Sequence, residues 1–289
     1  MKCSFALAAC LLVCATNVQA QHHRRQPPKP TPPPTTPAPP TTTPAKLLFA
    51  SEFDTADDFS SGSNKKWNTS WPLGTGLNSA ASPGEVQIYV DTQNNDTWGP
   101  SPFSQGQSMV CISATPTAGL PAPYTYTSGV LSTAGIFSFQ YGYVEMRCMA
   151  PSGSGFWPDF WMMKWTGSWY NVVWPPEIDI FQFSSRFTNE YYPSVLYGTG
   201  TTLGAFVEAG VDITKAMHTY GFEWTASTMN WYFDGKLVMT QKSPAGTAVP
   251  MFLMLSLAVG DDGGWIGPPD GSTAKWWIDY VRVYDKKPS

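Results

Sequence analysis

The sequence predicts an all-β protein, a two-sheet antiparallel β-sandwich or jelly roll. From Lys46 onward, short runs rich in Val, Ile, Tyr, Phe and Trp alternate with clusters of Gly, Pro, Asn, Asp and Ser, which is the pattern of many short strands. Few stretches show the 3.6-residue period of a helix. The 244 residues from Lys46 to Ser289 fit one sandwich better than two domains.

Residues 1–20 are predicted to be a secretory signal peptide. Met1 and Lys2 precede an apolar run from Cys3 to Ala15, and small residues at Val18 and Ala20 suit cleavage after Ala20. A membrane span needs about 20 apolar residues, so this run is too short. We therefore expect a secreted protein, extracellular or bound to a cell wall, with no membrane span.

Residues 21–45 are predicted to form a stiff linker or stalk. They hold ten of the 27 prolines and many threonines, and this composition favours extended polyproline II over a packed core. The folded domain is expected to cover residues 46–289.

Within that domain, five runs are predicted to be strands, and one further run could be a strand or a helix. Asp234-Gly235 separates two strand-like runs and predicts a hairpin turn. Residues 203–219 are the stretch that could form a helix, although their β-branched residues weaken this interpretation. The expected strands lie within residues 85–90, 136–150, 229–240, 251–259 and 275–285.

Composition narrows the classes of partner. The whole chain carries a formal charge of −4, and residues 46–289 contain 13 basic against 21 acidic side chains. A negative surface does not suit nucleic acid, which requires basic residues. Aromatic residues make up 15% of the chain, so some rings are expected to line a ligand groove as well as the core.

The mature chain would keep two cysteines, Cys111 and Cys148. Secretion permits a disulfide between them, but two buried free thiols would give the same sequence. Asn68-Thr-Ser and Asn95-Asp-Thr are predicted glycosylation sites.

The segment most informative about chemistry is Glu177-Ile-Asp179-Ile-Phe181-Gln182. Residues two apart on a strand face the same way, so Glu177 and Asp179 should project together while the isoleucines pack behind them. Two adjacent carboxyls repel, which raises the pKa of one of them, as acid/base chemistry requires. A solvated strand face is the alternative, but the aromatic run at residues 155–165 precedes this pair.

This segment, with ordered matches across residues 47–285, resembles glycoside hydrolase family 16, whose catalytic strand reads Glu-x-Asp-x-Glu or Glu-x-Asp-x-x-Glu. The resemblance implies a concanavalin A-like jelly roll and a retaining endo-β-1,3(4)-glucanase of the laminarinase type. It also implies that Glu177 is the nucleophile and that Asp179 tunes it. The family's acid/base glutamate is replaced here by Gln182.

The spacing from Glu177 to Gln182 makes a further prediction. Five residues separate the two, so in a regular strand Gln182 would face away from Glu177, and a one-residue bulge would restore it to the same side. The resemblance links the bulged form to laminarinase-like β-1,3-glucanases and several algal galactanases, and the unbulged form to lichenases and xyloglucan transferases. The expected substrate is therefore a β-1,3-glucan or a related polymer. Without a bulge, Phe181 would point into the cleft instead.

Further site residues follow from the resemblance and from the aromatic pattern. A family strand with a His near the carboxylates matches Ser194 to Gly198, which has no His; His218 is interpreted as structural. The chemistry requires no cofactor, but the resemblance implies a structural Ca²⁺ held partly by Asp279. The predicted sugar contacts are Trp157, Trp161, Glu85, Gln87 and Tyr197, with Trp98, Trp169, Trp174 and Trp265 as a binding rim.

Three functions compete for this sequence. The first is a β-glucan hydrolase whose acid/base step is impaired by Gln182, or rescued by another carboxyl such as Glu190. The second is a β-glucan-binding lectin or recognition protein without catalysis, and the third is a transglycosylase. A carboxamide can neither protonate a leaving oxygen nor activate water. The expected partner is a polysaccharide, and the protein is expected to be a monomer.

Overall fold

The computed structural model describes residues 43–72, 84–168, 173–260 and 264–289. The chain divides into two units, Met1–Thr42 and Thr43–Ser289. The predicted signal peptide and almost all of the predicted stalk lie outside the described residues.

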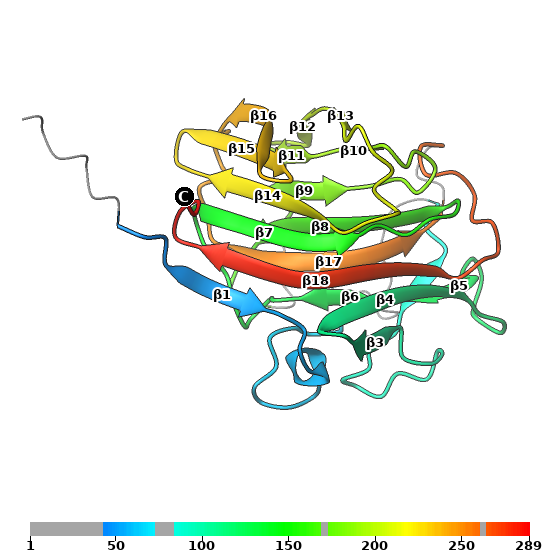
Figure 1. Cartoon of the computed structure of the whole chain (residues 1–289). Helices are drawn as coiled ribbons and strands as arrows, with labels where there is room; N and C mark the ends of the chain where they lie inside the picture. Colours follow the sequence, from blue (N-terminus) through cyan, green and yellow to red (C-terminus); the bar gives the residue numbers. More distant parts are fainter. Residues whose placement is uncertain (1–42, 73–83, 169–172, 261–263) are drawn as a thin grey trace, which may run out of the picture. The chain divides into compact units, whose positions relative to one another are not determined.

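Two antiparallel sheets form most of this unit, and Figure 1 shows them stacked as two layers. The larger sheet has ten strands in the order β16-β15-β14-β7-β18-β4-β5-β2, with β1 paired to β18 and β3 paired to β4. Its strands are β1 (Leu47–Ser51), β2 (Gln87–Tyr89), β3 (Phe103–Gly106), β4 (Met109–Pro116), β5 (Tyr126–Ser128), β7 (Gly142–Met149), β14 (His218–Trp224), β15 (Thr228–Phe233), β16 (Lys236–Lys242) and β18 (Ala274–Tyr284).

The smaller sheet carries the predicted catalytic segment. Its six strands follow the order β12-β11-β9-β8-β17-β6, and a separate pair joins β10 to β13. These strands are β6 (Val130–Ser132), β8 (Phe156–Lys164), β9 (Glu177–Gln182), β10 (Glu190–Tyr191), β11 (Ser194–Tyr197), β12 (Thr201–Gly204), β13 (Val207–Glu208) and β17 (Met251–Val259). The predicted all-β sandwich is therefore confirmed.

One strand pair departs from the expected antiparallel pattern. Strand β2 pairs with β5 in parallel, with Gln87 opposite Tyr126. The predicted hairpin is confirmed: β15 and β16 pair in antiparallel register, and Asp234 and Gly235 both have positive φ, 46° and 75°. Positive φ at both central residues is the geometry of a type I′ turn.

The possible helix at residues 203–219 does not form. The segment contains the end of β12, the short strand β13 and the start of β14, joined by turns. Its β-branched residues and glycines favour extended backbone. In the described part of the chain, the helical element is one turn of 3₁₀ helix, η1 (Ala56–Phe59), and no helix there has the length and apolarity that a membrane crossing requires.

The core lies between the two sheets and is strongly aromatic. Phe181 of β9 is fully buried and lies 4.3 Å, centroid to centroid, from Tyr220 of β14. Phe183, Tyr191 and Trp276 pack around the same ring. Alternating apolar residues on facing strands fill the space between stacked sheets, so the aromatic content is explained largely by the core.

The two cysteines of the domain are free and buried. Cys111 lies opposite Trp277 and Cys148 lies opposite Ile278, so β18 separates them. Cys148 belongs to the core between the sheets, whereas Cys111 lies beside the hydroxyl of Ser113. Of the two alternatives, the structure has two buried thiols.

One of the two predicted glycosylation sites is inaccessible in the folded domain. The Asn68 side chain is 5% exposed, and its Nδ2 donates a hydrogen bond of 2.8 Å to the backbone oxygen of Ala134. Asn95 is exposed. Glycosylation of this chain stays a prediction, with Asn95 as the accessible site.

Candidate active site

A β-bulge in β9 places Glu177, Asp179 and Gln182 on one face of the smaller sheet. Glu177 and Asp179 lie opposite Met163 and Trp161 of β8, but the register then shifts, and Gln182 lies opposite Asp159. Ile180 is the additional residue, and both Ile180 and Phe181 turn into the core. The predicted bulge therefore forms.

We call this face of the six-stranded sheet the acidic face, defined by Glu177, Asp179, Gln182 and Asp159. The strand next to β8 continues it, with Ser256 of β17 opposite Asp159. Beyond the carboxyls, a second apolar cluster separate from the main core covers the same face; it contains Tyr89, Val130, Ala134, Trp161, Met163, Phe252 and Met254, with Trp71 and Trp165 packed against it.

Glu177 is the most accessible carboxyl of the group. It is partly buried, and its Oε2 accepts a hydrogen bond of 2.7 Å from the indole Nε1 of Trp174. Burial raises the pKa of Glu177, and the bond from Trp174 opposes this rise. An indole donor aimed at a carboxylate favours the charged form, which is the form that a nucleophile needs.

Asp179 is fully buried beside Glu177. Ser194 of β11 donates a hydrogen bond to its Oδ2, and Trp231 Nε1 donates to its backbone oxygen at 3.0 Å from across the core. Burial, the charge of Glu177 and the charge of Asp159 all raise the pKa of Asp179 well above its usual range. A hydrogen bond between the two carboxyls raises the pKa of Asp179 further and lowers that of Glu177, so a neutral Asp179 is placed to donate its proton to Glu177.

Asp159 completes the acidic face, although sequence reasoning did not identify it. It is 7% exposed, and its Oδ2 lies 3.5 Å from Nε2 of Gln182. Burial and then the charge of Glu177 raise the pKa of Asp159 well above its usual range. The signal in the sequence was an Asp at an outward position of the otherwise apolar run Phe156–Met163, where alternation puts it on the face of Trp157 and Trp161.

These raised pKa values predict how stability depends on pH. A carboxyl with a higher pKa in the folded state binds more protons when folded, so its contribution to stability is complete below the unfolded pKa of about 4 and is lost as pH rises through the folded pKa. Asp179→Asn keeps a hydrogen-bond donor and an acceptor but cannot ionise, so it should lose less stability than wild type between pH 4 and pH 8. Urea titrations across this pH range measure the free energy of unfolding of both proteins. Equal changes of this free energy with pH in wild type and variant would contradict the prediction.

The predicted sugar-binding tryptophans divide between core and edge. Trp161 is 6% exposed, and its Nε1 donates a 3.0 Å hydrogen bond to Ser256 Oγ, so it is mainly a packing residue of the acidic face. Trp157 is partly buried and contacts Trp265 edge-to-face, at 6.3 Å between centroids. Tyr192 and Phe206 extend this aromatic group, and 54% of Phe206 is exposed. A sugar contact at Trp157 stays a prediction.

Two other predicted sugar contacts, Glu85 and Gln87, hydrogen-bond to each other. Gln87 is fully buried, and its Oε1 accepts a 2.8 Å bond from the backbone N–H of Val259. Its amide is therefore used at both ends within the protein. The Gln87 side chain therefore links β2 to β17. Glu85, which is 9% exposed, lies beside it.

The structure does not bring Tyr197 to the acidic face. On β11, Ser194 and Leu196 lie opposite Asp179 and Glu177, so Tyr197 points to the other side and packs against the main core. The position expected to carry the family's His is Leu196. Of the predicted rim, Trp98 and Trp265 are partly buried, Trp174 is 52% exposed, and Trp169 lies outside the described residues.

Glu190 and His218 lie on other elements. Glu190 pairs with Glu208 on the two-stranded sheet; burial and then the charge of Glu208 raise its pKa. The His218 Nδ1 lies 2.8 Å from Oδ2 of Asp234 at the β15–β16 turn, in agreement with a structural role.

The residues around Asp279 do not fit the calcium site that the resemblance implied. Arg147 forms an ion pair with the Asp279 carboxylate, and a guanidinium beside the carboxylate opposes a second cation. Among the described residues, no group of three or more His, Cys, Asp or Glu could hold a metal ion. Calcium binding stays a prediction that this arrangement does not favour.

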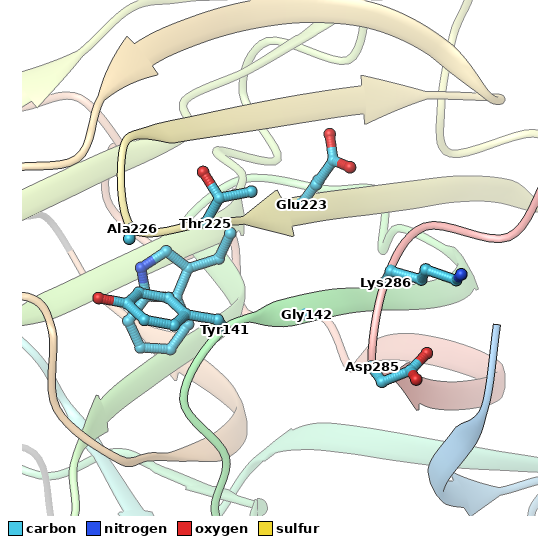
Figure 2. A pocket seen from close by; sticks show the side chains of 8 residues that line it. Tyr141, Gly142, Glu223, Thr225, Ala226, Asp285 and Lys286 are labelled. Carbon is cyan, nitrogen blue, oxygen red and sulfur yellow. The ribbon is translucent and has the colours of Figure 1, made fainter. Parts of the chain in front are cut away.

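A hollow at the ends of β7, β14 and β18 belongs to the larger sheet. Figure 2 shows Tyr141, Glu223 and Lys286 around it, and its other lining residues are Gly142, Trp224, Thr225, Ala226 and Asp285. None of the predicted site residues lines this hollow.

Comparisons with known proteins identify the family. Residues 90–282 match the model of glycosyl hydrolases family 16, and the chain belongs to this family. It is 33% identical to "Endo-1,3-1,4-beta-glycanase ExsH" of Rhizobium meliloti over 82% of this chain and 51% of the relative. It is 31% identical to a "Beta-glucanase" of Rhodothermus marinus over 55% of this chain and 62% of the relative.

A solved structure agrees with this assignment. The laminarinase catalytic domain from Thermotoga maritima superposes with a TM-score of 0.69 at 26% identity, covering 86% of this chain and all of that one. The chain spans about half the length of the first curated relatives that it matches.

Proposed function

We propose that this protein is a secreted endo-β-1,3(4)-glucanase of the laminarinase type that hydrolyses slowly and with retention of configuration. The observation that carries the proposal is the acidic face, where the bulge at Ile180 puts Glu177, Asp179 and Gln182 side by side. Relatives named as β-glucanases and laminarinases support the substrate class. The signal-like segment and the Pro- and Thr-rich residues 21–45 support secretion.

In the proposed mechanism, Glu177 attacks the anomeric carbon of the sugar and forms a glycosyl-enzyme ester. Asp179, kept neutral by its burial, holds Glu177 in place through a hydrogen bond and is itself fixed by Ser194. The exposed ring of Trp174 marks where a sugar would approach Glu177. Retaining hydrolysis also needs a group that protonates the leaving oxygen and later activates water, and Gln182 can do neither.

The alternative function is a β-glucan-binding protein without catalysis. The observation that favours it is Gln182 itself, since an amide keeps a hydrogen-bond donor and acceptor for a sugar but cannot transfer a proton. Against it stands the arrangement around Glu177, where hydrogen bonds from Trp174 and Asp179 favour the charged form that a nucleophile needs.

Reducing-sugar release from laminarin and mixed-linkage β-glucan separates the two functions. We expect residues 21–289 to release product slowly and Gln182→Glu to release it faster, because a carboxyl at position 182 would restore the group that the family uses there for positioned proton transfer. If wild type retains polymer in a pull-down but releases no product while Gln182→Glu does, the natural protein is a binder. If neither releases product, the proposed activity is wrong.

A further inference from the structure

Asp159 is the carboxyl that the fold places directly against the residue at the acid/base position. It lies opposite Gln182 in the β8–β9 pairing, and its Oδ2 is 3.5 Å from Gln182 Nε2. Directly paired residues on neighbouring strands project from the same face, with their Cβ atoms about 4.5–5.5 Å apart. The two side chains therefore reach the same region beside Glu177.

The other carboxyl oxygen of Asp159 lacks a partner. In the described part of the chain, Oδ1 is buried and makes no hydrogen bond. Buried polar atoms nearly always have partners, and an exception needs an explanation. If Oδ1 of Asp159 bonds to the substrate during the reaction, it would have no partner in the free protein.

We propose that Asp159 performs the acid/base step in this protein, in place of a carboxyl at position 182. The inference rests on the proposed hydrolase function and deepens it by naming the group that moves the proton. Gln182 then has a different role: its amide donates toward Asp159 and orients that carboxyl.

The proposed reaction has two steps, and Asp159 transfers a proton in each. Protonated Asp159 gives its proton to the glycosidic oxygen while the Glu177 carboxylate attacks the anomeric carbon, so the leaving sugar departs as an alcohol and an ester forms on Glu177. The Asp159 carboxylate then takes a proton from water, whose oxygen attacks the anomeric carbon and returns the ester electrons to Glu177. Asp159 ends protonated and Glu177 ends charged, as both began.

The electrostatic surroundings agree with this assignment. An acid must be protonated at the start of the reaction, and burial together with the charge of Glu177 raises the pKa of Asp159. The titratable groups that face it are Glu177 and Asp179 from β9 and Tyr89 from β2. All of them are acids, so their ionisation also opposes that of Asp159.

Glu190, the first carboxyl that follows Gln182 in the sequence, provides a matched control. It lies on the two-stranded sheet against Glu208, whereas Asp159 contacts Gln182. Comparing the hydrolysis rates of Asp159→Asn and Glu190→Gln therefore tests two carboxyls, of which only Asp159 lies beside Gln182.

The experiment measures both variants on laminarin and on 2,4-dinitrophenyl β-laminaribioside, whose leaving group departs without a proton. We expect Asp159→Asn to lose about 10²-fold or more on laminarin and to form the glycosyl-enzyme from the aryl substrate nearly as fast as wild type. Added azide should then speed turnover of Asp159→Asn and yield the β-glycosyl azide, because azide displaces Glu177 from the ester. Asp159→Glu should recover part of the laminarin activity and Glu190→Gln all of it.

Several outcomes would overturn the inference. Unchanged laminarin hydrolysis by Asp159→Asn, or a loss in Glu190→Gln instead, rules out Asp159 while the hydrolase function stands. Equal losses on laminarin and on the aryl substrate, without azide rescue, would indicate a structural role. Wild type that cleaves the aryl substrate but not laminarin has a working Glu177 and no acid, which also excludes Asp159. Wild type that cleaves neither substrate contradicts the hydrolase function itself.

Discussion

Glu177→Ala is expected to abolish hydrolysis of both laminarin and the aryl laminaribioside. Removing the nucleophile of a hydrolase costs on the order of 10⁴- to 10⁶-fold, and no leaving group can compensate because the bond to Glu177 never forms. The loss of activity on both substrates distinguishes Glu177 from a residue that only transfers protons.

Azide gives the sharper readout for Glu177. In the space left by the Glu177→Ala change, azide can attack the anomeric carbon directly, from the side opposite the leaving group, so the product is the α-glycosyl azide. The variant at Asp159 should give the β-anomer. Glu208→Gln, an exposed carboxyl on β13, is the control and should keep wild-type rates. Wild-type activity in the Glu177→Ala variant would show that Glu177 is not the nucleophile.

Phe181→Ala is expected to be the most destabilising of the changes considered, by about 3–5 kcal/mol. The Phe181 side chain is fully buried among Phe183, Tyr191, Tyr220 and Trp276. Truncation leaves a cavity that rigid strands on both sides cannot fill. For a domain of this size, the loss corresponds to a decrease in Tm of roughly 6–20 °C.

The measurement is urea unfolding of Phe181→Ala beside Leu237→Ala. Leu237 lies on β16 and is 57% exposed, so its truncation should change stability by no more than about 0.5 kcal/mol. The comparison also tests the bulge. Without it, Phe181 would lie on the acidic face, and its truncation would cost little stability but would weaken glucan binding.

The sequence determined most of the fold because its information is local. Alternating apolar residues and turn residues predicted the strands, and Asp234-Gly235 predicted its hairpin, since these depend on neighbouring residues alone. The pair Glu177 and Asp179 could also be placed on one face, because the two-residue period of a strand does not depend on its partners.

Pairing between distant strands decided what the sequence left open. Whether β9 would bulge at Ile180 depended on the register that β8 imposes. The same register brought Asp159 to Gln182. The pairing of β11 with β9 turned Tyr197 towards the core, and a hydrogen bond from Val259 of β17 holds the buried Gln87 of β2. Sequence patterns assign a side chain to a face of its own strand, but only the packed sheets determine which side chain from another strand lies beside it.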